Sequence, residues 1–160
     1  MKLYVMRHGP AEDFADSRRD FDRALTDSGR ERVRAVARAL HDAQELPRSV
    51  VTSPLVRARQ TAEIVALLAT ETREPFIDDA MAPGGDGEGL VRGLCSAGRR
   101  RVMVVGHEPD LADLVSALLG ASFGRDMLKA MVVGLSLESP TGRASLRFVL
   151  DPKSLGWSRA

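Results

Sequence analysis

The sequence predicts an α/β domain with a largely parallel central sheet and antiparallel strands at one edge. Short apolar runs, typical of buried strands, alternate along the chain with longer stretches in which apolar residues recur at helical spacing. The last two apolar runs are separated only by a turn, which indicates an antiparallel hairpin added to the sheet. Because the 160 residues have one composition throughout, we expect residues 1–160 to form a single domain.

The first predicted helix lies between two short strands. Residues 2–6 form an apolar run that ends at turn residues, and residues 9–25 form a charged stretch without a clear period, which predicts a loop. Helical spacing then predicts a helix over residues 26–43, and Ser28 with Glu31 has the pattern of a capping box at its start.

The second strand, residues 49–52, leads into a strong helix-start pattern. We expect Ser53 to be the N-cap and Pro54 the first helical residue of a helix that ends near Thr70. The rest of the chain predicts a short strand at 75–77, a loop at 83–89, a helix at 88–97, a strand at 101–105, a helix from 109 to about 119, and a hairpin of 132–137 and 144–149.

Charge and cysteine content exclude several classes of protein. Lys and Arg together number 23 and Asp and Glu 22, which argues against a nucleic-acid binder that works by bulk charge. The single cysteine, Cys95, excludes an internal disulfide and fits a reducing compartment. The N-terminus does not have the pattern of a signal peptide, and the apolar runs are far shorter than the ~20 residues that span a bilayer. We therefore expect a cytoplasmic protein that binds neither nucleic acid nor membrane.

Polar residues follow three of the predicted strands at the point where each strand ends. They are Arg7-His8-Gly9 after the first strand, Ser53 with nearby Arg57 after the second, and Gly106-His107 after the strand at 101–105. In open α/β sheets, ligands bind outside the carboxyl ends of the strands. We therefore expect two histidines and two arginines to meet at one ligand-binding edge.

Arg57 and His8 are residues of the types that a phosphate-binding enzyme needs at this edge. A cation in the first turn of a helix opposes the positive end of the helix dipole, so Arg57 favours a bound anion, with pairing to a nearby carboxylate as the alternative. His8 could act as a nucleophile or base, with a satisfied core histidine as the alternative. Gly9 would let a backbone N–H approach the ligand.

Metal-dependent and cysteine-dependent chemistry are the alternatives to a histidine nucleophile at this edge. His8 and His107 lack short-spaced partner ligands and lie beside arginines, so we expect no metal and no cofactor. Cys95 begins a C-x-x-G-x-x-R match to the phosphate loop of cysteine-dependent phosphatases. Its predicted position at the end of a helix, before a strand, reverses the order that lowers a thiol pKa. The glycine-rich run at 84–89 predicts a flexible loop.

Taken in order, three motifs resemble the histidine phosphatase superfamily, which includes the phosphoglycerate mutases. The motifs are Arg7-His8-Gly9, the segment at 53–62 that reads SPLVRARQTA, and Gly106-His107-Glu108-Pro109. The short chain is similar to the SixA-type phosphohistidine phosphatases. The resemblance covers residues 1–150 and implies a three-layer α/β/α fold. It implies that His8 is the nucleophile and that Arg7, Arg57 and His107 bind the phosphoryl oxygens.

The same resemblance implies further residues and a substrate class. Arg23 matches a pocket arginine, Ser53 and Gly9 are substrate-binding candidates, and Asp79 is the best match to the general acid of larger relatives. A phosphoramidate can leave as a neutral amine once protonated, so a weakly matched acid favours phosphohistidine on a partner protein, for example a histidine-phosphotransfer domain. The alternatives are a small phosphorylated molecule as substrate and a non-catalytic phosphoprotein-binding domain. The sequence predicts no oligomeric state.

Overall fold

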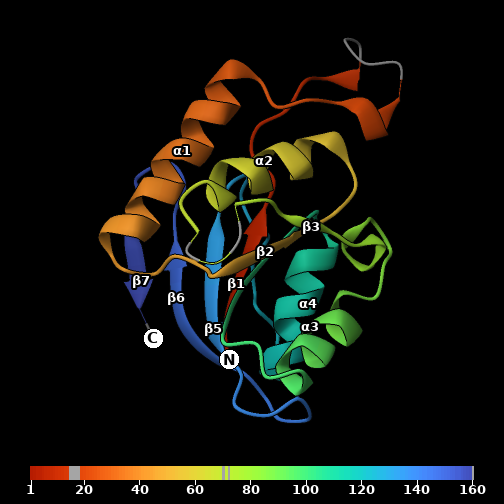
Figure 1. Ribbon diagram of the computed structural model, residues 1–160, viewed down its shortest axis with the longest axis vertical. Helices are drawn as coiled ribbons and strands as arrows, with labels where there is room; N and C mark the ends of the chain where they lie inside the picture. The colour runs from red at the N-terminus through yellow and green to blue at the C-terminus, as the bar shows by residue number, and fades with distance from the viewer. Residues whose placement is uncertain (15–18, 70, 72, 160) are drawn as a thin grey trace.

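The computed structural model describes residues 1–14, 19–69, 71 and 73–159, and their elements form three layers (Figure 1). Among these residues, the strands are β1 (Lys2–Arg7), β2 (Ser49–Thr52), β3 (Phe76–Ile77), β4 (Arg101–Gly106), β5 (Val132–Ser136), β6 (Ser145–Leu150) and β7 (Trp157–Arg159). The helices are α1 (Asp27–Asp42), α2 (Val56–Ala66), α3 (Gly87–Ser96) and α4 (Asp110–Leu119), with short 3-10 helices η2 (Asp20–Asp22) and η3 (Asp79–Met81). No helix within the described ranges is long and apolar enough to cross a membrane.

The strands form one mixed sheet in the order β3-β2-β4-β1-β5-β6-β7. β3, β2, β4 and β1 run parallel, whereas β5, β6 and β7 pair antiparallel. The predicted α/β class, with a parallel centre and an antiparallel edge, is confirmed. The sequence did not predict β7, because its three residues have no alternating apolar pattern.

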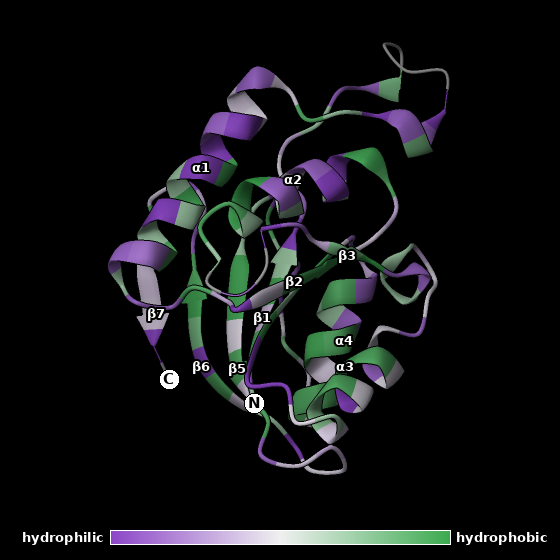
Figure 2. Ribbon diagram, viewed as in Figure 1, coloured by the Kyte–Doolittle hydropathy of each residue, from purple (hydrophilic) through white to green (hydrophobic). Residues whose placement is uncertain are grey.

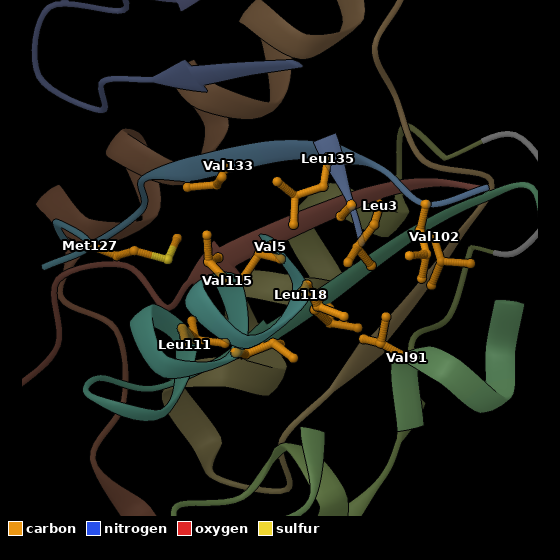
Figure 3. Packing of buried hydrophobic residues seen from close by; sticks show 14 of the residues in the cluster. Leu3, Val5, Val91, Val102, Leu111, Val115, Leu118, Met127, Val133 and Leu135 are labelled. Carbon is orange, nitrogen blue, oxygen red and sulfur yellow. The ribbon is translucent and has the colours of Figure 1, made fainter. Parts of the chain in front are cut away.

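Alternation along the central strands divides the core between the two faces of the sheet. Leu3 and Val5 of β1 pack with residues of α3 and α4, as Figure 3 shows. Tyr4 and Met6 of the same strand face the opposite way and pack with residues of α1 and α2. Figure 2 shows β5 and most of β6 in apolar colours, whereas α1 has many hydrophilic residues. This burial on both faces is what a continuous apolar strand predicts.

The start of α1 differs from the predicted capping box. Thr26 is the N-cap, and its side chain accepts a hydrogen bond from the Gly29 N–H at 3.0 Å. Ser28 lies inside the first turn, so the prediction for Ser28 and Glu31 was wrong. Thr26, Asp27 and Ser28 are all cap-forming residues, and the path of the preceding loop selects the first of them.

The start of α2 also differs from the prediction. The N-cap is Leu55, which makes no side-chain cap bond, and the helix begins at Val56 rather than at Pro54. Ser53 is not the N-cap of α2, and its Oγ instead accepts the Leu55 N–H and lies beside His107 Nε2. The helix ends at Ala66, and the predicted end near Thr70 falls outside the described residues.

Candidate active site

Three segments that are far apart in the sequence meet at one edge of the sheet. β1 lies beside β4, and β4 lies beside β2, so all three strands end at the same edge. The His8 N–H donates to the Gly106 carbonyl at 3.1 Å, and the Ser53 N–H donates to the Val105 carbonyl at 3.0 Å. The ring centroids of His8 and His107 lie 5.3 Å apart. The predicted meeting of these segments is therefore confirmed.

The buried imidazole of His8 has a different partner at each nitrogen. Nδ1 lies 2.8 Å from the Gly9 carbonyl oxygen, which can only accept, so Nδ1 carries the ring proton. Nε2 accepts a hydrogen bond from Arg57 Nε at 3.3 Å. Burial is the main cause that lowers the pKa of His8 to about 3, with the positive surroundings adding to the shift. His8 is therefore neutral at pH 7 and keeps a lone pair on Nε2.

Arg57, the second residue of α2, is buried and has an acidic partner. Its Nη1 donates to the Asp20 backbone carbonyl at 2.8 Å, and its Nη2 donates to the Asp20 carboxylate at 3.1 Å. Of the two alternatives that the sequence left open, the structure shows the carboxylate partner. Sequence reasoning missed Asp20; the signal was its position three residues before Arg23, with which it forms an ion pair.

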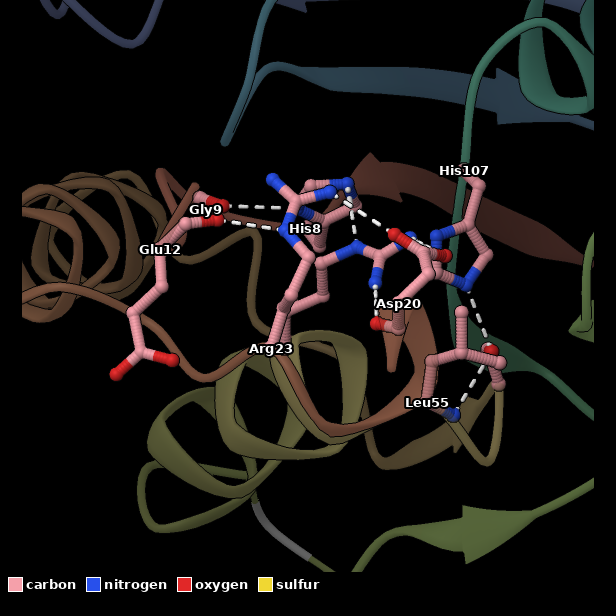
Figure 4. Close-up of polar contacts among 9 residues, drawn as sticks. His8, Gly9, Glu12, Asp20, Arg23, Leu55 and His107 are labelled. Carbon is pink, nitrogen blue, oxygen red and sulfur yellow. Dashed lines mark hydrogen bonds and ion pairs between the residues drawn. The ribbon is translucent and has the colours of Figure 1, made fainter. Parts of the chain in front are cut away.

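His107 is held from one side by Ser53. Its Nε2 lies 2.7 Å from Ser53 Oγ, and Ser53 Oγ also accepts the Leu55 N–H at 3.2 Å (Figure 4). Burial is the main cause that lowers the pKa of His107 to about 4, so the ring is neutral at pH 7. A Ser53 hydroxyl that donates to Nε2 leaves the ring proton on Nδ1. Ser53 thus contacts a site histidine, which is a positioning contact.

Two buried side-chain nitrogens at the site have no hydrogen-bond partner among the described residues. They are Nδ1 of His107 and Nε of Arg7, whose Nη1 donates to the Met127 carbonyl at 2.7 Å. Burial lowers the pKa of Arg7, and the nearby Glu108 opposes that shift. Both carboxylate oxygens of Glu108 are also buried, and burial raises its pKa. Unpartnered buried donors are costly and mark a place where a ligand can bind. The sequence prediction missed the role of Glu108 beside Arg7, although the residue belongs to one of the quoted motifs.

Glycine is needed at position 9 for a reason that differs from the predicted one. Its N–H donates to Thr61 Oγ1 at 3.0 Å and so does not face a ligand, which corrects the expectation. A Cβ at this position would lie 2.6 Å from Val33 Cγ2 of α1. Glycine is required here because α1 packs closely against the segment that follows the nucleophile candidate.

The structure brings Arg23 to the site but leaves Asp79 outside its network. Arg23 Nη1 donates to the Asp20 carboxylate at 2.9 Å, and its Nε donates to the Glu12 carbonyl at 2.6 Å. Asp79 is exposed at the start of η3, and none of the hydrogen bonds that join the site residues involves it. Its predicted role as general acid stays a prediction.

A cavity of about 310 Å³ adjoins His107 between η3, the start of α3 and α4. Its lining includes four carboxylates, which are those of Asp86, Glu88, Asp110 and Asp113. In the described part of the chain, no group of three or more His, Cys, Asp or Glu side chains is placed to share a metal ion. The acidic wall makes this side of the site unfavourable for a second anionic group.

Cys95 lies where the sequence predicted, in the last turn of α3 and before β4. Its thiol approaches the Leu137 carbonyl at 3.9 Å. The order of helix, turn and strand is the reverse of the one that places a cysteine thiolate at a helix N-terminus. The structure therefore gives no support to a cysteine-based phosphate loop.

Comparison with known proteins agrees with this geometry. The sequence profile of the histidine phosphatase superfamily (branch 1) matches residues 3–81. An uncharacterized protein from Picosynechococcus sp. is 37% identical over 140 residues, covering 84% of each chain. The phosphohistidine phosphatase SixA of Escherichia coli K12 is 27% identical over 164 residues, covering 100% of this chain and 99% of SixA.

A solved structure shows the same fold. The protein histidine phosphatase SixA complexed with tungstate superimposes with a TM-score of 0.87 and 26% identity, covering 98% of this chain and 100% of that one. The fold and these relatives define an α/β phosphatase. The chain belongs to the histidine phosphatase superfamily.

Proposed function

We propose that this chain is a metal-independent phosphatase that acts through a phosphohistidine intermediate on His8. The carrying observation is the buried, neutral His8, whose Nε2 lone pair faces the Arg57 guanidinium. Nε2 forms a bond to phosphorus, and the bond from phosphorus to the leaving group breaks with its electron pair going to the leaving group. Water then attacks phosphorus, so that His8 and inorganic phosphate are released.

The charges around His8 suit this reaction. Phosphoryl transfer depends mainly on positioning and on positive charge near the phosphoryl oxygens. Arg7 and His107 each have a buried donor without a partner among the described residues, and Arg57 already touches His8. We assign all three to the phosphoryl oxygens, with Ser53 holding His107. Arginine and histidine donors supply the charge stabilisation that a metal ion supplies in other phosphatases.

We propose phosphohistidine on a partner protein, such as a histidine-phosphotransfer domain, as the substrate. Both the curated relative and the solved structure named SixA are described as phosphatases of phosphohistidine or of protein histidine. An imidazole leaves as a neutral group once it is protonated, so the reaction does not need a strong acid at the position of Asp79. The acidic cavity beside His107 disfavours leaving groups that carry carboxylates or phosphates.

The test is phosphate release from a histidine-phosphorylated phosphotransfer domain in the presence of EDTA. We expect wild type and Cys95→Ser to be equally active, and His8→Ala to lose at least about 10³-fold, as removal of a nucleophile does. Cys95→Ser is the matched control, because it removes the other candidate nucleophile and leaves the site intact. Loss of activity in Cys95→Ser with survival in His8→Ala would refute the assigned nucleophile.

Cleavage of p-nitrophenyl phosphate tests the assigned nucleophile independently of the proposed substrate. A wild-type enzyme that cleaves this ester through His8 but spares phosphohistidine would keep the nucleophile and exclude the proposed substrate. The small-molecule phosphomonoesterase would then be the correct reading.

A further inference from the structure

Asp20 occupies the guanidinium groups that a phosphoryl ligand would use. Its backbone carbonyl and its carboxylate take both Nη groups of Arg57, and the carboxylate also accepts from Arg23 (Figure 4). The Arg57 side chain is 7% exposed, whereas that of Asp20 is 41% exposed. Asp20 therefore covers Arg57 from the solvent side and remains accessible to an incoming group.

The Asp20 carboxylate also lies close to His107. Figure 4 shows its side chain beside the His107 ring, and its negative charge acts on His107. Arg57 joins Asp20 directly to His8, because its Nε donates to His8 Nε2 while its Nη groups donate to Asp20. A phosphoryl group placed against His8 Nε2 therefore meets the Arg57 guanidinium that Asp20 holds, and it competes with the Asp20 carboxylate for Nη2.

A carboxylate in this place affects two classes of substrate in opposite ways. When an ester is cleaved, negative charge develops on the leaving oxygen, and a nearby carboxylate opposes that charge. When phosphohistidine is cleaved, the reactive form has a protonated ring, and a nearby carboxylate stabilises that cation. The N–P bond then breaks with its electron pair going to the ring nitrogen, so a neutral imidazole departs while His8 Nε2 bonds to phosphorus.

We propose that Asp20 is a specificity-determining residue, whose carboxylate selects phosphoryl groups on a protonatable nitrogen against phosphate esters. This inference rests on the proposed function of the His8 site. It adds a residue to the reaction that the motifs of the sequence do not include. Asp20 is neither a nucleophile nor a metal ligand in this proposal, and its effect is electrostatic.

The experiment compares Asp20→Asn with Asp22→Asn on two substrates. Asp22 lies in the same 3-10 helix but pairs with Arg19 at the surface, so it is a matched control for loss of a carboxylate. We expect Asp20→Asn to lower kcat/KM for the phosphorylated phosphotransfer domain about tenfold and to raise it for p-nitrophenyl phosphate severalfold. Asp22→Asn should leave both values near wild type.

The ratio of the two kcat/KM values tests the proposal, because a merely structural role of Asp20 would change both values alike and leave their ratio unchanged. Equal changes on both substrates, or no change on either, would overturn the proposal. Inhibition of ester cleavage by inorganic phosphate gives a reading independent of phosphohistidine. Asp20→Asn should bind phosphate severalfold more tightly, and an unchanged inhibition constant would also overturn it. If wild type spares phosphohistidine but Asp20→Asn still tightens phosphate inhibition, the proposed substrate fails while the competition of Asp20 with phosphate stands.

Discussion

Folding buries two histidines in neutral form, so acid should destabilise this protein in a way that can be calculated. The pKa values in the fold are about 3 for His8 and about 4 for His107, against an ordinary value of 6.5. Both are lowered, so their stabilising contribution is complete above pH 6.5 and is lost as the pH falls toward the folded pKa. Between pH 7 and pH 5, the unfolded chain takes up about 0.7 proton per histidine and the folded chain takes up almost none. Linkage converts this difference to a loss of about 2 kcal/mol in the free energy of unfolding for each histidine.

Urea unfolding at pH 7 and pH 5 measures the effect. We expect His8→Asn to lose about 2 kcal/mol less than wild type between the two pH values, because the carboxylates titrate in both proteins and cancel in the comparison. His41→Asn, which removes an exposed histidine of α1, is the matched control. An equal loss of stability in wild type and His8→Asn would refute the argument, since His8 would then be able to bind a proton inside the fold.

Four other substitutions test how the scaffold holds the site. Gly29→Ala should lower the free energy of unfolding by about 1–3 kcal/mol in urea titrations, because its Cβ would overlap the Pro10 carbonyl oxygen, whereas Gly93→Ala has open space and should gain about 0.5–1 kcal/mol. Arg57→Lys should lower kcat/KM for p-nitrophenyl phosphate about 100-fold, because lysine lacks the planar fork that reaches His8 and a phosphoryl group together. Ser53→Ala should lower the same kcat/KM about tenfold, because it removes the partner of His107 Nε2; wild-type activity in Ser53→Ala would show that other contacts hold the ring.

The elements that set the fold class could be predicted because apolar periodicity is a local property of the chain. The runs that became β1, β2 and β4 and the helical patterns of α1, α2 and α4 all carry it. Once the strands are parallel neighbours, their carboxyl ends meet at one edge. The positions of Arg7, His8, Arg57 and His107 at that edge then follow without knowledge of any side-chain contact.

The contacts that orient these residues could not be predicted, because they depend on the path of loops. Asp20 reaches Arg57 across 37 positions of sequence, and Thr61 reaches Gly9 across 52. Nothing in the local pattern indicates such pairs. The predicted start of α2 was wrong for a related reason. Ser53 has the chemistry of an N-cap, but its hydroxyl contacts His107, which directly follows β4. A tertiary partner replaced the local one.

The site residues differ in what holds them, and this difference indicates which of them can move when a ligand binds. The His8 ring is fixed by the backbone carbonyl of Gly9, and His107 by Ser53, which itself hydrogen-bonds to the backbone at Leu55. Arg57 is instead held by Asp20, a half-exposed residue at the start of the short 3-10 helix η2. A phosphoryl group can therefore take Nη2 of Arg57 by displacing the Asp20 carboxylate, while the hydrogen bonds that hold the two histidine rings on their other sides stay in place. For His8 Nε2 to bond to phosphorus, its hydrogen bond from Arg57 Nε must also break. The histidine rings are thus pre-organised in the free protein, and Arg57 is the residue whose partners have to change.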